Sequence, residues 1–182
     1  RGLKDKSPEE LTQAKVDLLE EIINTQNDML KSTLDYNPVK IFVPYKEVLP
    51  LYDFGLKVPE DFTLIWSNDN YGYVRRYPSE KERARIGGNG IYYHNSYWAP
   101  AGRSYVFLCS TPLAHTKNEL SKAYTEGIRK LWVMNIGAMK PLEQEMSFFS
   151  KLAWDIDKTL DSSVYWNNRI DLCKDALYLD SV

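Results

Sequence analysis

The sequence predicts an α/β fold in which short, mainly parallel strands alternate with flanking helices. Short apolar runs recur along the chain, and stretches with helical spacing separate several of them. Strands joined through helices usually pair in parallel and are covered by those helices. A length of 182 residues suffices for one domain with a substantial core. Because no internal repeat, low-complexity segment or clear linker interrupts the chain, residues 1–182 are predicted to form a single domain.

The first predicted element is a long helix. Residues 7–10 read Ser-Pro-Glu-Glu, which places a hydroxyl at the N-cap, proline at the first helical position and glutamate at the third. Apolar residues then recur at roughly helical spacing from Leu11 to Leu30. The pattern therefore predicts a helix from about Ser7 to about Thr33 with one buried face.

The other elements follow from apolar runs and helix-ending signals. Strands are predicted at residues 40–44, 62–66, 91–94, 104–109 and 131–134, and helices at about 46–53, 117–126 and 141–160. Gly55 and Gly127 each follow a predicted helix, where glycine commonly closes the last turn. One more short helix is predicted in the tail from Ser162.

Composition argues against several classes of function. A formal net charge of −2 gives no electrostatic basis for binding nucleic acid or an anionic membrane, and no apolar run is long enough to span a bilayer. Cys109 and Cys173 are isolated and are interpreted as buried or incidental thiols. His94 and His115 are too few for a histidine zinc cage, so neither a metal nor another cofactor is expected.

Aromatic residues are unusually frequent. The chain has 13 Tyr, 5 Trp and 6 Phe. Aromatic side chains mostly build cores, but tyrosines near strand ends also line sugar-binding clefts, where ring faces pack against pyranose C–H groups. Composition alone leaves both interpretations open.

Polar and aromatic residues follow four predicted strands at their carboxyl ends. These segments are Tyr45-Lys46-Glu47, Ser67-Asn68-Asp69-Asn70, residues 94–98 (His-Asn-Ser-Tyr-Trp) and residues 135–137 (Asn-Ile-Gly). Carboxyl ends of parallel strands meet at one edge of a sheet, where α/β proteins bind ligands. Any one of these residues could instead be a turn former or a helix cap. Their recurrence at four strands favours a site.

The residue types in these segments limit the chemistry. No serine, cysteine or lysine has an evident base partner, and Gly87-Gly88-Asn89-Gly90 precedes a strand instead of opening a helix, unlike a nucleotide-binding loop. Carboxylates, amides and tyrosines remain. Glycosidic bond hydrolysis uses this set, with one carboxylic acid protonating the leaving oxygen and one carboxylate activating water or attacking.

The sequence resembles glycoside hydrolase family 115, the xylan α-glucuronidases. The resemblance is carried by four blocks in the family's order: RGLKD (1–5), VPYKEVLPLYDFGLKVPEDFTLIWSNDNYGYVRRYP (43–78), GGNGIYYHNSYWAPAGRSY (87–105) and LWVMNIGAMKPLEQEMSFFSKLAW (131–154). It implies a catalytic β/α barrel and an inverting enzyme. The implied reaction removes glucuronic acid, or its 4-O-methyl ether, linked α-1,2 to xylan or a glucuronoxylo-oligosaccharide.

The resemblance also implies roles for individual residues. Glu47 is the expected general acid, and Asp5 is expected near the catalytic water. Arg1 matches a position near the uronic acid. The remaining expected substrate-binding residues are Tyr45, Asn68, Asp69, Asn70, Tyr97 and Asn135.

Two positions depart from the family pattern. Asn68 stands where the family usually has Asp, and Ala138 where it usually has another carboxylate. The alternatives are a non-catalytic carbohydrate-binding remnant and a structural α/β domain whose polar strand ends are only caps. Glu47 and Asp5 favour the enzyme, whereas Asn68 and Ala138 favour the binding remnant.

The length implies a partial barrel. A complete β/α barrel needs roughly 250 residues, so the resemblance implies that this chain is the C-terminal half of a larger catalytic barrel. Open strand edges would favour a homodimer or association with the missing half. The parent enzyme is expected to be secreted or periplasmic, although no signal is visible in this chain.

Overall fold

The computed structural model describes residues 12–96, 109–140 and 142–157. The predicted α/β fold is confirmed: four parallel strands form one sheet in the order β1-β2-β3-β4. The strands are β1 (Lys40–Phe42), β2 (Phe62–Ser67), β3 (Asn89–His94) and β4 (Ile128–Asn135). The helices are α1 (Gln13–Thr33), α2 (Val48–Phe54), α3 (Glu80–Arg83), α4 (Leu113–Thr125) and α5 (Glu143–Trp154).

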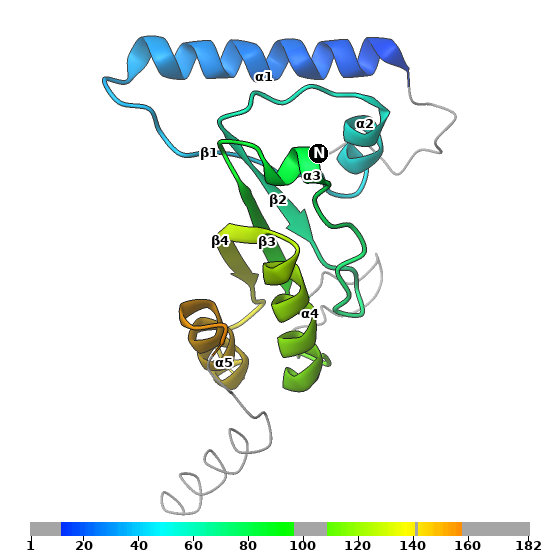
Figure 1. The fold of residues 1–182 in the computed structure, drawn as a ribbon, viewed down its shortest axis with the longest axis vertical. Coiled ribbons are helices and arrows are strands. Elements are labelled where there is room, and N and C mark those ends of the chain that lie inside the picture. Colours follow the sequence, from blue (N-terminus) through cyan, green and yellow to red (C-terminus); the bar gives the residue numbers. More distant parts are fainter. Residues whose placement is uncertain (1–11, 97–108, 141, 158–182) are drawn as a thin grey trace, which may run out of the picture.

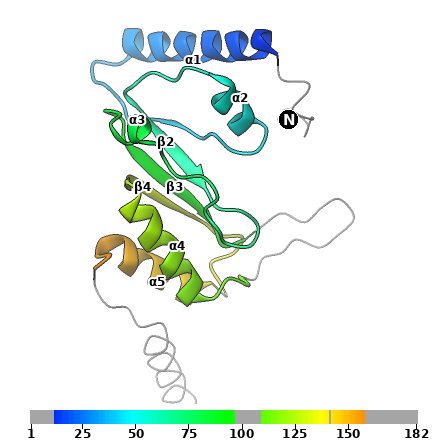
Figure 2. The same ribbon diagram turned by 45° about the vertical axis from the view of Figure 1, so that its right-hand side comes forward.

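The chain runs through the sheet without reversing direction. Each strand pairs with the next strand in sequence, and α2, α3 and α4 lie in the three successive connections. Within the described residues, α1 lies at one end of the elongated molecule and α5 at the other (Figures 1 and 2). Because all four strands are parallel, their carboxyl ends lie at a single edge, called here the C-terminal edge.

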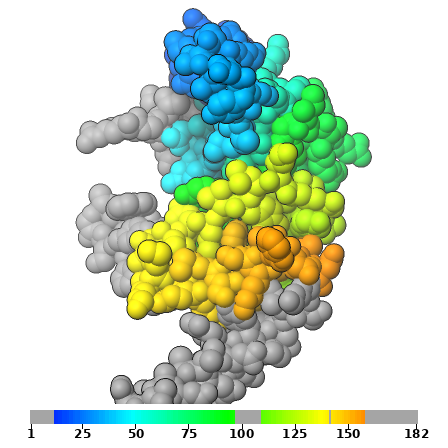
Figure 3. Space-filling view, turned by 90° about the vertical axis from the view of Figure 1, so that its left-hand side faces the viewer, coloured from blue at the N-terminus to red at the C-terminus, as the bar shows by residue number. Residues whose placement is uncertain are grey.

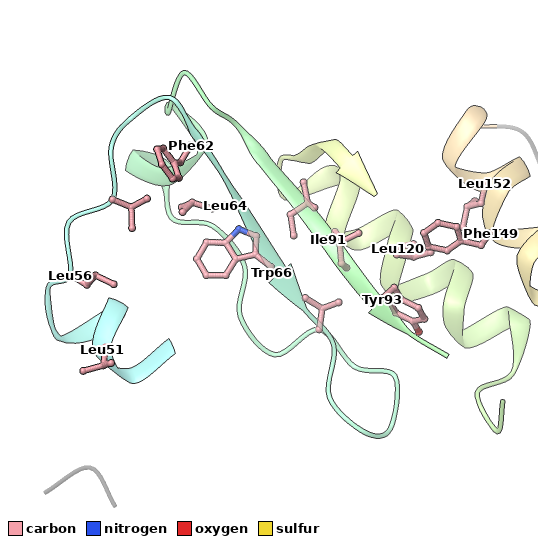
Figure 4. Packing of buried hydrophobic residues seen from close by; sticks show 14 of the residues in the cluster. Leu51, Leu56, Phe62, Leu64, Trp66, Ile91, Tyr93, Leu120, Phe149 and Leu152 are labelled. Atoms are coloured by element: carbon pink, nitrogen blue, oxygen red, sulfur yellow. The ribbon is translucent and has the colours of Figure 1, made fainter. Parts of the chain in front are cut away.

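A hydrophobic cluster runs continuously from α2 across the sheet to α5 (Figure 4). Its labelled members are Leu51, Leu56, Phe62, Leu64, Trp66, Ile91, Tyr93, Leu120, Phe149 and Leu152. Alternate residues of β2 and β3 enter this cluster, as the two-residue repeat of a strand requires. The cluster fixes the strands whose ends carry the polar segments.

Trp66 lies near the middle of this cluster and is 1% exposed. Its indole N–H donates to Asn89 Oδ1 at 2.9 Å, and the Arg76 guanidinium lies 4.3 Å from its ring centroid. Arg76 also donates to both carboxylate oxygens of Glu82 at 2.7 Å. Arg76 therefore links β2 to α3.

The backbone passes very close to itself where the glycine-rich loop enters β3. A Cβ atom on Gly87 would lie 2.2 Å from the carbonyl oxygen of Phe62. The same loop is tied down by Thr63, whose hydroxyl donates to Gly87 O at 2.7 Å. The glycine-rich loop therefore packs closely against the start of β2.

Several predicted boundaries differ from the observed ones. The first helix begins at Gln13, because Thr12 is an extended N-cap residue; the Ser-Pro-Glu-Glu segment lies outside the described residues. The four-residue α3 was not predicted. Of the strand predicted at 104–109, only Cys109 is described, and it lies in no strand; the tail from Ser162 is not described.

The two outer strands remain unpaired on one side within the described residues. Near β1, Val39 is 81% and Ile41 is 51% exposed. The segment containing β4 (yellow) forms part of the outer surface in Figure 3. None of the helices in the described ranges is long and apolar enough to cross a membrane.

Candidate functional site

The turn after β1 has an unusual backbone that positions two candidate residues. Lys46 has φ 48° and is the only non-glycine with positive φ in the described part of the chain. The turn is closed by hydrogen bonds from Val48 N to Tyr45 O at 3.0 Å and from Leu49 N to Lys46 O at 3.2 Å. Non-glycine residues in this region are strained and are often found at functional sites.

Glu47 is the N-cap residue of α2, but its side chain makes no capping hydrogen bond. A helix-start carboxylate that served only as a cap would accept from a backbone N–H of the first turn. Glu47 is half-buried. It is therefore placed at the C-terminal edge with a carboxyl group that α2 does not use as a cap.

Tyr45 and His94 connect the ends of β1 and β3 across the end of β2. Their ring centroids lie 5.3 Å apart, and Tyr92 lies 5.0 Å from His94 on β3. His94 is also the register partner of Asn135 on β4, whose carbonyl accepts from Asn95 N at 2.9 Å. The structure thus brings Tyr45 and Asn135 to the same edge, with His94 between them.

Asn68, a predicted substrate-binding residue, lies with its side chain against the backbone of His94. Asn68 is 1% exposed. Its Oδ1 accepts from His94 N at 2.7 Å, and its Nδ2 donates to His94 O at 3.1 Å. This burial has a simple cause: both ends of the short amide meet the backbone of the neighbouring strand, which draws the side chain inward.

Asp69 holds together the loop that follows β2. Its Oδ1 accepts from the backbone N–H groups of Tyr71 at 2.9 Å and Tyr73 at 3.0 Å, and its Oδ2 accepts from Arg75 Nε at 2.7 Å. Burial tends to raise the pKa of Asp69, but the hydrogen bonds from Arg75, Tyr71 and Tyr73 outweigh it and lower that pKa. Asp69 therefore caps the turn after β2. This is the structural role that the sequence allowed for it beside substrate binding.

Electrostatics link the residues at this edge. Burial raises the pKa of Tyr45, and the nearby charges of Asp69 and Glu47 raise it further. Burial, with a smaller contribution from Lys46, lowers the pKa of His94 to about 4. The charges of Glu47 and Asp69 thus both act on Tyr45, and His94 is neutral at neutral pH.

The remaining predicted residues divide into two groups. Asn70 is exposed in the loop after β2. Arg1, Asp5 and Tyr97 lie outside the described residues. His94 was not among the predicted site residues, although its position at the end of an apolar strand within Tyr92-Tyr93-His94 could have drawn attention to it.

A hollow of about 460 Å³ lies between α2 and α3, away from Glu47. Its charged lining includes Arg76 and Glu82, which bind each other, and Arg85, which donates to Pro59 O at 2.6 Å. These groups already have structural partners. In the ranges described here, no cluster of His, Cys, Asp and Glu could hold a metal ion.

Comparison with known proteins identifies the family of this chain. Residues 1–170 match glycosyl hydrolase family 115. The chain belongs to this family. The resemblance found in the four sequence blocks is thereby confirmed. Among curated proteins, none matches the chain.

One solved structure similar to this chain is a family 115 4-O-methyl-α-glucuronidase with specificity for decorated arabinogalactans. It shares 35% sequence identity with this chain, and the TM-score is 0.80. The alignment covers 94% of this chain and 22% of that enzyme. The family 115 chain described here therefore spans about a fifth of the length of this relative.

Proposed function

We propose that this chain is part of the catalytic β/α barrel of a family 115 α-glucuronidase. The observation that carries the proposal is the C-terminal edge of a chain of this family. There Tyr45 contacts His94, Asn135 is the register partner of His94, and the charge of Glu47 acts on Tyr45. The C-terminal edge is the active-site edge of β/α barrels. The solved relative, a 4-O-methyl-α-glucuronidase, supports the same class of reaction.

The sheet topology supports a partial barrel. Neighbouring strands follow one another in sequence and are all parallel, as in a β/α barrel, whereas a doubly wound sheet reverses its order at a switch point. We propose that β1 and β4 pair with further strands, supplied by the rest of a longer protein or by a second copy of this chain. Exposed Val39, just before β1, and exposed Ile41, within β1, support a covered edge.

In the proposed reaction, Glu47 protonates the glycosidic oxygen while a second carboxylate activates water on the opposite face of the sugar. Asp5 is the proposed second carboxylate, because Asp69 is engaged by Arg75 and two backbone N–H groups. Attack by water in one step inverts the anomeric configuration. Arg1 would pair with the uronic acid, and Tyr45, Asn70, Tyr97 and Asn135 would bind hydroxyl groups.

The proposed substrate is glucuronic acid or its 4-O-methyl ether, linked α-1,2 to xylan. The solved relative favours a second candidate, because that enzyme is specific for decorated arabinogalactans. Since both substrates are polysaccharides too large to enter a cell, we propose that the parent enzyme is secreted or periplasmic. A non-catalytic carbohydrate-binding protein remains the alternative that Asn68 and Ala138 favour.

The experiment is to incubate the protein that carries this chain with glucuronoxylan and with a glucuronic-acid-decorated arabinogalactan, and to follow products by proton NMR. Release of a β-configured uronic acid from xylan supports the whole proposal. Release only from arabinogalactan corrects the substrate, and an α-configured product contradicts inversion. Binding without release from either polysaccharide contradicts the enzyme and supports the binding protein.

A further inference from the structure

The amide of Asn68 meets the backbone of His94 with both its ends. Oδ1 accepts from His94 N at 2.7 Å, and Nδ2 donates to His94 O at 3.1 Å. Reversing the amide would set donor against donor and acceptor against acceptor. Since Asn68 is 1% exposed, water cannot compensate such a mismatch, and the orientation of the amide is fixed.

The same oxygen of Asn68 also lies 3.0 Å from Nδ1 of the His94 ring. An amide oxygen carries no hydrogen, so the proton of this contact must come from Nδ1. Ser67 Oγ lies 3.1 Å from Nδ1 and 3.1 Å from the carbonyl oxygen of Tyr92. If the hydroxyl donates to that carbonyl, it too is an acceptor for Nδ1–H.

We propose that Asn68 is a positioning residue that holds the proton of His94 on Nδ1 and keeps the ring neutral beside Tyr45. A neutral ring protonated at Nδ1 has its lone pair on Nε2. The ring therefore has a hydrogen-bond acceptor at Nε2 and carries no positive charge. This inference rests on the proposed function only for its relevance to substrate binding.

The groups around His94 come from three elements. Tyr45 and Lys46 follow β1, Ser67 is the last residue of β2, and Tyr92 is on β3. Burial and the Lys46 charge both disfavour the imidazolium. The neutral amide at position 68 adds no opposing charge, so it preserves the neutral ring that these surroundings favour.

A carboxylate at position 68 would act in the opposite direction. It could still accept from His94 N and Nδ1, but it would place a negative charge about 3.0 Å from the ring nitrogen. An opposite charge within such a distance stabilises the charged form of a titrating group. It would also lose the hydrogen bond to His94 O, because an ionised carboxylate has no hydrogen to donate.

The test is a pH titration of the nitrogen-15-labelled full chain, with histidine ring nitrogens followed by long-range proton–nitrogen NMR. The chain has only two histidines, and His115→Gln assigns the signals of His94. The expected spectrum at neutral pH has Nδ1 protonated and Nε2 unprotonated. A proton on Nε2 in the unsubstituted chain overturns the proposal without any variant.

Two substitutions sharpen the result. Asn68→Asp should increase the proton affinity of His94 at least about tenfold. Asn118→Asp, which adds the same charge at an exposed position of α4, should leave it unchanged. An unchanged titration in Asn68→Asp, or an equal change in Asn118→Asp, contradicts the proposal.

No substrate enters this measurement. A protein that releases no uronic acid but shows the Nδ1-protonated ring contradicts the proposed function and leaves the role of Asn68 standing. An active protein whose His94 is protonated on Nε2 supports the proposed function and contradicts the role of Asn68.

Discussion

Tyr45 and His94 lie with their ring centroids 5.3 Å apart, although β2 lies between β1, which Tyr45 follows, and β3, which His94 ends. This contact joins the turn after β1 to the end of β3. It follows from the parallel register, because all four strands place their carboxyl ends at one edge. The candidate site is therefore made by the sheet, and residues far apart in sequence contribute to it.

Acid should destabilise the fold in two steps. The pKa of His94 is about 4 when folded and 6.5 in the unfolded chain, so the unfolded state takes up a proton first as pH falls. Stability is thus fully present above pH 6.5 and falls towards pH 4, by roughly 3 kcal/mol in all. Urea unfolding at several pH values measures this loss. In His94→Gln, the free energy of unfolding should depend less on pH in this range.

The second step belongs to Glu82. Burial would raise the pKa of Glu82, but the hydrogen bond from Arg76 and those at Ser79 outweigh it and lower the pKa to about 2 from 4.5. The contribution of Glu82 to the free energy of unfolding is present above pH 4.5 and is lost as pH falls towards 2. Glu82→Gln should remove this lower part of the pH dependence alone; a curve unchanged below pH 4.5 would count against the assignment.

Trp66→Phe should destabilise the protein by about 3 kcal/mol. The substitution removes the indole N–H and leaves Asn89 Oδ1 without that donor in a buried place, and it weakens the contact with Arg76. The control is Trp154→Phe on α5, where the side chain is 92% exposed and the expected change is within about 0.5 kcal/mol. Chemical denaturation compares the two, and equal losses would contradict the described packing.

Asp69→Asn should loosen the loop after β2. It removes the charge that accepts hydrogen bonds from Arg75 and from the amides of Tyr71 and Tyr73. Hydrogen bonds to a charged group contribute about 1.5–3 kcal/mol, so those two amides should exchange at least about tenfold faster. Hydrogen exchange followed by NMR measures this directly. Asp35→Asn, at an exposed position, is the matched control. In that variant the exchange rates of the Tyr71 and Tyr73 amides should be unchanged.

The sequence predicted the parallel α/β fold because its signals are local. Apolar runs located all four strands of the described sheet, and Gly55 closes α2 as a C-cap residue. The missed α3 also had a local signal. Ser79 and Glu82 form a capping box, and the Ser-Glu-Lys-Glu pattern could have revealed it.

Other features could not be read locally. The pairing of Arg76 with Trp66 and Glu82 depends on how β2 and α3 pack. The spacing of residues in the sequence does not predict this packing. Asn68 resembled its polar neighbours in sequence but faces inward, because its amide fits the backbone of His94 on the adjacent strand. For a residue at a strand end, the direction of the side chain decides its role.

Glu47 is the proposed general acid of an α-glucuronidase. Its direct test is the rate of uronic acid release by the protein carrying this chain, with Glu47 and with Glu47→Gln, from glucuronoxylan and from an aryl glucuronide whose leaving group needs no protonation. The amide keeps the shape but has no proton to transfer. General acid catalysis contributes about 10²–10⁴-fold, so the rate on xylan should fall by that factor.

The aryl glucuronide should lose far less activity, and Glu21→Gln on the exposed surface of α1 should leave both rates unchanged. This dependence on the leaving group separates proton donation from a general disturbance of the site. Near-normal release from xylan by the Glu47→Gln protein would contradict the account, and Glu47 would then be only a carboxylate at the start of α2.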